Sequence, residues 1–213
     1  MADVLDLISL SEAKRALNID VTETLVDIEL AGVVTAVSRR LDDLCGAVVT
    51  RTLTGDLYDG EGDTQIFLRR APIGITATTT VSSVVEYQPN SGGSVTLTEE
   101  TITVKPSEGY MLDPTTGILY RRRGGWDSYW WPGRRNVAVT WAPGRYPDTA
   151  SVDEKFRSAA AIAVAHIWTN IGAGAGAGRF GADNGQAFGI PPWDVPKAAL
   201  MLLSAELLPA GIA

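Results

Sequence analysis

The sequence predicts an α+β protein in which a helical body is interrupted by an inserted antiparallel β-sheet or small barrel. Two observations predict this class. Residues 20–45 and residues 152–171 carry apolar side chains at three- and four-residue steps, the spacing of an amphipathic helix. Residues 47–147 lack that spacing and consist of short β-branched runs between glycine- and aspartate-rich turns. Helical patterns on both sides of a β-rich stretch indicate that the stretch is an insertion.

Five segments follow from these patterns. We expect an N-terminal helical part over residues 1–46, the inserted β domain over 47–147, a helix that returns to the body over 148–171, a glycine-rich linker over 172–190 and a C-terminal helix or arm over 191–213.

The N-terminal part predicts a helix, a tight turn and a longer helix. Ser9 and Glu12 form a capping-box pattern ahead of a helix over Leu10–Leu17. Asp20 and Glu23 repeat the pattern ahead of a helix that ends at Gly46. The apolar stripe of this long helix must be covered by other helices of the chain or by a neighbouring copy. For a subunit interface the candidates are Val26, Leu30, Val33, Val37, Phe156, Ala160 and Ala163.

The inserted domain predicts strands separated by turns rich in glycine, asparagine and aspartate. Charged residues in those turns are explained by exposure to solvent. The β-branched runs predict strands at Val48–Leu53, Thr64–Leu68, Thr78–Tyr87, Val95–Leu97, Thr101–Lys105, Gly117–Arg121 and Asn136–Trp141.

After the β domain, residues 152–171 predict a helix whose alanines allow close packing. Glycine and alanine then alternate from Gly172, and the stretch to Gly189 predicts a flexible linker. Pro196 suits the first turn of a last helix over Lys197–Leu208. The candidate residues for an arm that binds another protein are Trp193, Val195, Leu200, Leu203 and Leu207.

Composition narrows the class of protein. The net charge is −7, and residues 1–46 carry nine acidic and four basic side chains, whereas residues 47–147 carry ten of each. This balance argues against a dedicated nucleic-acid binder, which needs clustered Lys and Arg. The sequence has no run of about eighteen apolar residues and no signal-peptide pattern, so we expect a soluble protein made in a cytosol. The single Cys45 excludes an internal disulfide.

No residue pattern predicts catalysis, and we expect neither an enzyme nor a cofactor or metal site. Residues 176–181 match G-x-G-x-x-G, but a helix precedes them and a loop follows, the reverse of a dinucleotide site. His166 is the only histidine and lies in an apolar helix. The acidic turns at residues 56–63 do not have the spacing of a calcium loop.

Residues 121–135 form the densest unusual patch, in which arginines alternate with aromatic side chains. Three interpretations remain open. The rings cover the end of the sheet with arginines over them, or they contact another protein, or they form a carbohydrate- or nucleic-acid-binding module. The candidate contact residues are Trp126, Tyr129, Trp130, Trp131 and Arg134.

The order of several stretches resembles the head–tail connector (adaptor) proteins of long-tailed bacteriophages. The opening LISLSEAKRALNID precedes a long helix that ends RLDDLCG. The later stretches are LRRAPI, GILYR and GRRNVAVTWAPG, which leads into a helix. The similarity spans most of residues 5–170 and depends on the order of these motifs.

The resemblance implies a structural protein of the virion neck, made in the bacterial cytoplasm. Its expected assembly is a dodecameric ring below the portal vertex. That ring would bind the portal protein above and a stopper or tail protein below, and DNA would pass through its channel without sequence-specific binding. No membrane partner is implied.

Overall fold

The computed structural model describes residues 3–69, 80–88, 92–113, 116–176 and 195–207, and it divides into two compact units. One unit consists of residues 1–45 and 148–207, and the other is built on residues 46–147. We call them the helical unit and the β unit. Helices in one and strands in the other confirm the α+β class.

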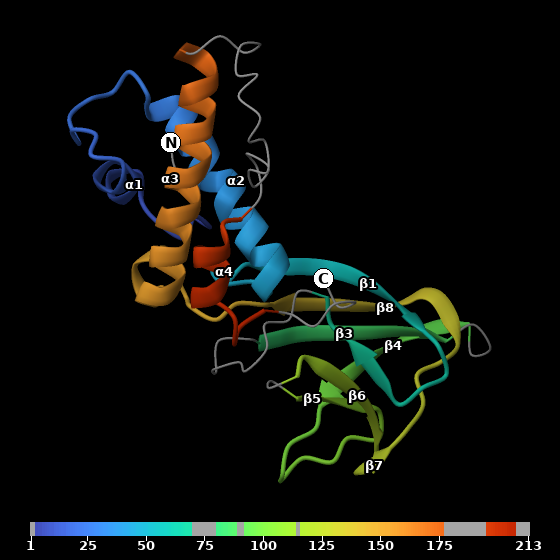
Figure 1. The fold of residues 1–213 in the computed structure, drawn as a ribbon. Helices are drawn as coiled ribbons and strands as arrows, with labels where there is room; N and C mark the ends of the chain where they lie inside the picture. Colours follow the sequence, from blue (N-terminus) through green and yellow to red (C-terminus); the bar gives the residue numbers. More distant parts are fainter. Residues whose placement is uncertain (1–2, 70–79, 89–91, 114–115, 177–194, 208–213) are drawn as a thin grey trace. The chain divides into compact units, whose positions relative to one another are not determined.

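The helical unit is built around α3, which contacts the three other α-helices. Its elements are α1 (Leu10–Ala16), α2 (Asp27–Cys45), η1 (Thr149–Ser151), α3 (Glu154–Gly176) and α4 (Lys197–Leu202) (Figure 1). Three alanines on one face of α3 are fully buried, which permits the close approach of neighbouring helices. These alanines are Ala159, Ala160 and Ala163. Within the described residues, no helix combines the length and apolar character that crossing a bilayer requires.

Both predicted boundaries of the first helix are close to those observed, and its cap is confirmed. The Ser9 hydroxyl accepts a hydrogen bond from the Glu12 N–H, and the Glu12 carboxylate accepts one from the Ser9 N–H at 2.7 Å. Gly46 follows α2 with a φ of +79°, the left-handed conformation that favours glycine after a helix.

The long helix begins at Asp27 and not at Asp20 as the sequence pattern predicts. The Asp20 carboxylate accepts hydrogen bonds from the N–H and hydroxyl of Thr22, which closes a local turn. The carbonyls of Val21 and Glu23 point to the ammonium of Lys14, so they are not available to a helix. A contact with another helix therefore overrides the capping pattern.

The β unit contains an eight-stranded sheet in the order β1-β8-β3-β4-β5-β6-β2, with β7 paired to β6. The sheet is mixed and not purely antiparallel, because β4 and β5 run parallel. Its strands are β1 (Leu53–Gly60), β2 (Gln65–Phe67), β3 (Thr80–Gln88), β4 (Gly93–Glu99), β5 (Gly109–Asp113), β6 (Ile118–Arg123), β7 (Trp126–Asp127) and β8 (Gly133–Ala142).

Two predicted strands are wrong. Residues 48–51 form hydrogen bonds with the 143–146 segment outside the sheet ladder, and the strand begins at Leu53. Residues 101–105 form a loop instead, in which the Thr101 N–H donates to the Val104 carbonyl at 3.0 Å and the Lys105 ammonium pairs with the Glu100 carboxylate at 2.7 Å. The strand in this region is β5, which the β-branched pattern does not mark.

One apolar core lies inside the β unit. Strands from β1 at one end of the sheet to β2 at the other contribute side chains to it, so the sheet curls around its own core. Its members are Tyr58, Ile66, Leu68, Val84, Leu97, Tyr110, Leu119, Trp130, Val137, Val139 and Trp141. This enclosed core makes the β unit a rigid support for the segments at its surface.

Candidate functional site

The aromatic segment 121–135 divides into a buried and an exposed part. It contains the end of β6, all of β7 and the start of β8. Trp126 and Tyr129 are 79% and 72% exposed, whereas Trp130 is fully buried in the core. Trp131 is half-buried and Arg134 is exposed. Trp130 therefore belongs to the core, and the sequence-based expectation that it contributes to a contact surface is corrected by its burial.

A buried ion pair lies beneath this segment. Arg121 on β6 and Glu86 on β3 approach to 3.1 Å, with side chains 3% and 1% exposed. Arg121 also donates to the Gly109 carbonyl at 3.1 Å, and its guanidinium lies 5.9 Å from the centre of the Trp130 ring. The other Glu86 oxygen accepts a hydrogen bond from the Trp131 N–H at 2.7 Å. The pair therefore fixes the backbone that presents Tyr129 to solvent.

A second charge cluster joins β6 and β7 to the loop over residues 100–108. Glu100 accepts hydrogen bonds from Arg122 at 3.1 Å and from Lys105 at 2.7 Å. Arg122 also pairs with Asp127. The bonds from Arg122, and then those from Lys105, hold the pKa of the Glu100 carboxyl below its usual value of 4.5. This cluster fixes the strands on either side of the turn that carries Trp126.

Hydrogen bonds and packing also restrain buried tyrosines in the β unit. Burial, reinforced by Glu99, raises the pKa of Tyr110 to about 12. Burial and then the hydrogen bond to Asp56 raise the pKa of Tyr58 above its usual value. Both hydroxyls therefore stay protonated across the physiological range.

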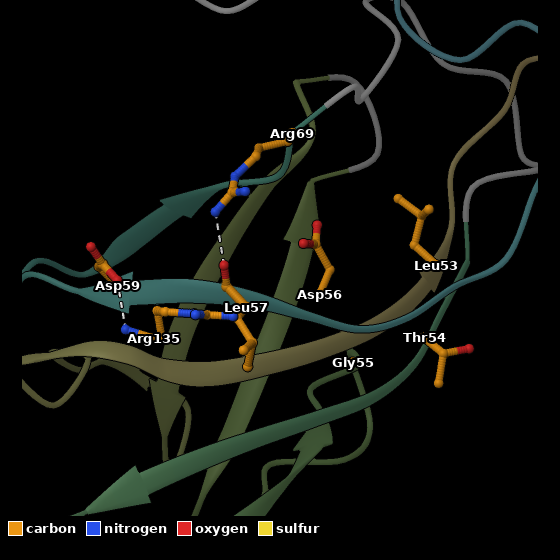
Figure 2. Close-up of a pocket in the computed structure, with 8 residues that line it drawn as sticks. All are labelled: Leu53, Thr54, Gly55, Asp56, Leu57, Asp59, Arg69 and Arg135. Atoms are coloured by element: carbon orange, nitrogen blue, oxygen red, sulfur yellow. Dashed lines mark hydrogen bonds between the residues drawn. The ribbon is translucent and has the colours of Figure 1, made fainter.

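A hollow of about 780 Å³ lies over β1, the strand at one end of the sheet (Figure 2). Figure 2 shows that the Arg69 guanidinium reaches the carbonyl of Leu57, to which it donates at 2.8 Å. The Asp59 carboxylate accepts a hydrogen bond from the Arg135 N–H at 2.6 Å. Arg69 thus occupies a backbone acceptor of the terminal strand, which protects this sheet edge from pairing with other strands.

The described residues offer no arrangement suited to metal chemistry. They contain no group of three or more His, Cys, Asp or Glu side chains placed to hold a metal ion. His166 is half-buried on α3, and Cys45 is buried at the end of α2.

Most candidates for a subunit interface lie in the core of the helical unit. Leu30, Val33 and Val37 of α2 are 0%, 7% and 2% exposed, and Phe156, Ala160 and Ala163 of α3 are fully buried. Helices of the same chain cover the stripe, so these six residues are not accessible to a neighbouring copy. Val26, which precedes α2, is half-buried.

The C-terminal candidates also belong largely to the helical unit. Val195 and Leu203 are 5% and 0% exposed, and Leu200 and Leu207 are half-buried. Helix α4 packs on α3, and the Lys155 ammonium pairs with Glu206 at 2.5 Å. These residues therefore do not form a free arm. Trp193 lies outside the described residues, as does the predicted linker from 177 onward, while residues 172–176 continue α3 instead of starting that linker.

Sequence reasoning missed a group of exposed apolar residues in the segment that enters α2. Val21, Leu25 and Ile28 are 45%, 90% and 86% exposed. The sequence contains a signal for this exposure. Leu25 and Ile28 do not lie on the apolar stripe of α2, which continues through Leu30, so they are not expected to pack in the helical core. The ion pair of Glu86 and Arg121 also had a signal in the sequence. Side chains of β3 and β6 alternate between the two faces of the sheet, and both charged residues fall at positions that face the core.

Comparison with known proteins gives a likeness of fold. No family model matches the sequence. No curated protein matches it either. A solved structure, the neck of an empty GTA (gene transfer agent) particle computed with C6 symmetry, contains a chain of similar fold. The TM-score is 0.50 at 14% sequence identity, and the match covers 76% of this chain and 78% of that chain. The chain therefore has the fold of a protein found in the neck of a phage-like particle.

Proposed function

We propose that this protein is a structural subunit of the head–tail neck of a tailed phage or phage-like particle, without enzymatic activity. The observation that carries the proposal is the fold match to a chain of the GTA neck, which includes about three quarters of both chains. The order of sequence motifs that resembles phage connector proteins supports the same role, because it is a property of the sequence and not of the fold.

Within the neck, we propose the role of connector (adaptor) ring. Copies of the chain assemble around a channel, bind the portal protein on one side and a stopper or tail protein on the other, and let DNA pass. The structure of the GTA neck was computed with C6 symmetry, with which a dodecamer is compatible. The acidic excess of residues 1–46 supports a wall that does not retain DNA, because negative side chains repel phosphates.

We propose that Trp126 and Tyr129, with Arg134, contact the next protein of the neck. Trp and Tyr side chains are enriched in binding hot spots, and these two rings are exposed on a segment that buried charges hold in place. The alternative, a carbohydrate- or nucleic-acid-binding module, loses support because Trp130 is in the core and cannot take part in a stacking platform.

Co-purification tests the proposed function. The protein would be produced together with the portal protein of the same genome, and a tag on the portal protein would be used for capture. We expect both proteins in one complex with the mass of a portal ring plus a ring of this chain. Failure of the two to associate at micromolar concentrations would contradict the proposal. Binding of glycans or single-stranded DNA that is lost in Trp126→Ala would favour the alternative.

A further inference from the structure

The segment that enters α2 presents an apolar surface that is held rigidly. Val21, Leu25 and Ile28, which we call the apolar knob, point largely into solvent. Three large aliphatic side chains exposed within eight residues of sequence make this segment a candidate contact surface, because exposed apolar patches mark interaction sites. Val21 and Leu25 lie in residues 18–26, which have no regular secondary structure, and Ile28 lies in the first turn of α2.

Lys14 explains why the knob keeps its conformation. Its side chain is 3% exposed, and its ammonium donates to the Val21 carbonyl at 3.1 Å and to the Glu23 carbonyl. The ammonium also pairs with the Asp27 carboxylate at 2.5 Å. One buried charge therefore fixes three points of the segment. A preformed surface binds without the entropy cost of ordering.

A second apolar surface lies on α4. Met201 and Leu202 are 67% and 45% exposed, and Lys197 and Ala198 are exposed one helical turn earlier. These four residues, the α4 outer face, lie opposite Ala199 and Leu203, which are fully buried. In Figure 1 the segment before α2 and helix α4 lie well apart on the helical unit. The two surfaces therefore do not cover one another within one chain.

The charges around the two surfaces are opposite. Residues 18–29 contain Asp20, Glu23, Asp27 and Glu29 and no Lys or Arg. The α4 outer face carries Lys197, and the acidic residue that follows the helix, Glu206, is paired with Lys155 at 2.5 Å. If the knobs of two subunits met, or the α4 outer faces of two subunits met, like charges would be brought together. Contact of the knob with the α4 outer face would bring apolar side chains together and place acidic groups near Lys197.

We propose that the apolar knob of one subunit docks on the α4 outer face of a second copy of this chain. Such a contact uses two different surfaces of the same subunit and is therefore heterologous, the type of interface that closes into a ring. The inference rests on the proposed ring function and deepens it. It assigns the contact between subunits to the apolar knob and the α4 outer face, and not to the buried stripe of α2.

Two single-surface variants test this proposal by native mass spectrometry of the full-length protein. Leu25→Asp changes the knob and Met201→Asp changes the α4 outer face, and both side chains are exposed, so the fold is retained and circular dichroism checks it. Ile102→Asp, at a residue that is 96% exposed in the β unit, is the matched control. Wild-type protein and the control are expected to form rings, alone or with portal protein added.

Each single-surface variant is expected to lose the ring and remain a monomer. A mixture of the two is expected to give a heterodimer of twice the monomer mass and nothing larger, because one intact knob meets one intact α4 outer face. If either variant formed rings, or if the mixture gave no heterodimer, the proposed docking would be wrong. Neither result would contradict the proposed neck function. Wild-type protein that forms no ring under any condition would instead refute the proposed function and this inference with it.

Discussion

Glu86 and Arg121 form an ion pair at 3.1 Å in the interior of the β unit, with almost no exposure of either side chain. The two residues come from β3 and β6, which are not neighbours in the sheet. Hydrogen bonds from Gln88 and from the Trp131 backbone complete the coordination of the Glu86 carboxylate. The pair therefore joins distant strands and also holds the aromatic segment, so its loss has consequences that can be measured.

Arg121→Met is expected to destabilise the β unit by about 3–5 kcal/mol, because it leaves the buried Glu86 carboxylate without its cation. Urea unfolding followed by tryptophan fluorescence measures this change. Arg134→Met serves as the control, since Arg134 is exposed, and such a surface substitution changes stability by at most about 0.5 kcal/mol. Equal effects of the two substitutions would show that the ion pair does not stabilise the fold.

Trp130 and Trp126 are expected to respond differently to truncation. Trp130→Ala empties a core position and costs about 3–5 kcal/mol, as large-to-small core substitutions of aromatic residues do. Trp126→Ala removes a ring that is 79% exposed and leaves the unfolding midpoint unchanged. The Trp130 indole N–H has no hydrogen-bond partner among the described residues. Trp130→Phe is therefore tolerated better than Trp130→Ala, and the reverse order would contradict the assigned packing.

Helix α4 is expected to stabilise the helical unit. Leu203→Ala removes a fully buried side chain, and such a change costs about 2–5 kcal/mol. Met201→Ala on the exposed side of the same helix is the matched control. Thermal unfolding followed by circular dichroism compares the two variants. A chain truncated after Gly189 lacks Val195 and Leu203, so it too is expected to unfold at a lower temperature; an unchanged midpoint would contradict the docking of α4 on α3.

The stability of the β unit is expected to fall in acid through Glu100. Its folded-state pKa is lowered, first by the hydrogen bond from Arg122. The contribution is therefore fully present above the unfolded-state value near 4.5 and is lost as the pH falls through the lowered pKa. Urea unfolding midpoints between neutral and acidic pH measure this loss, and Glu100→Gln is expected to flatten the dependence. A variant with the wild-type dependence would refute the assignment to Glu100.

The helical part of the fold was partly predictable from the sequence because its determinants are local. The Ser9 and Glu12 capping box and the glycine after Cys45 act within a few residues, so the pattern alone locates them. The start of α2 was not predictable in this way. Lys14 reaches the carbonyls of Val21 and Glu23 across a turn, and a contact of this kind leaves no periodic signal.

In the β unit, too, features that depend on non-local contacts could not be predicted from the sequence. Strands with β-branched runs, such as β3 and β8, were located correctly, but β5 has the sequence GYMLD and was missed. β4 and β5 pair in parallel, and the loop between them contains the ion pair of Glu100 and Lys105. Such a non-local pairing has no signal in the sequence pattern. Of the candidate contact residues, Trp126 and Tyr129 are exposed as a contact surface requires, whereas Trp130 is not. Aromatic residues that are close in the sequence look alike to a reading based on residue type. Only the fold shows which ring is buried and which rings are exposed.

Electron microscopy of the purified full-length protein, alone at high concentration and mixed with portal protein, shows whether this chain forms a neck ring. We expect class averages of closed rings with a central channel and rotational symmetry, either from the protein alone or stacked on the portal. Particles that remain single subunits under both conditions would contradict the assignment to a neck ring.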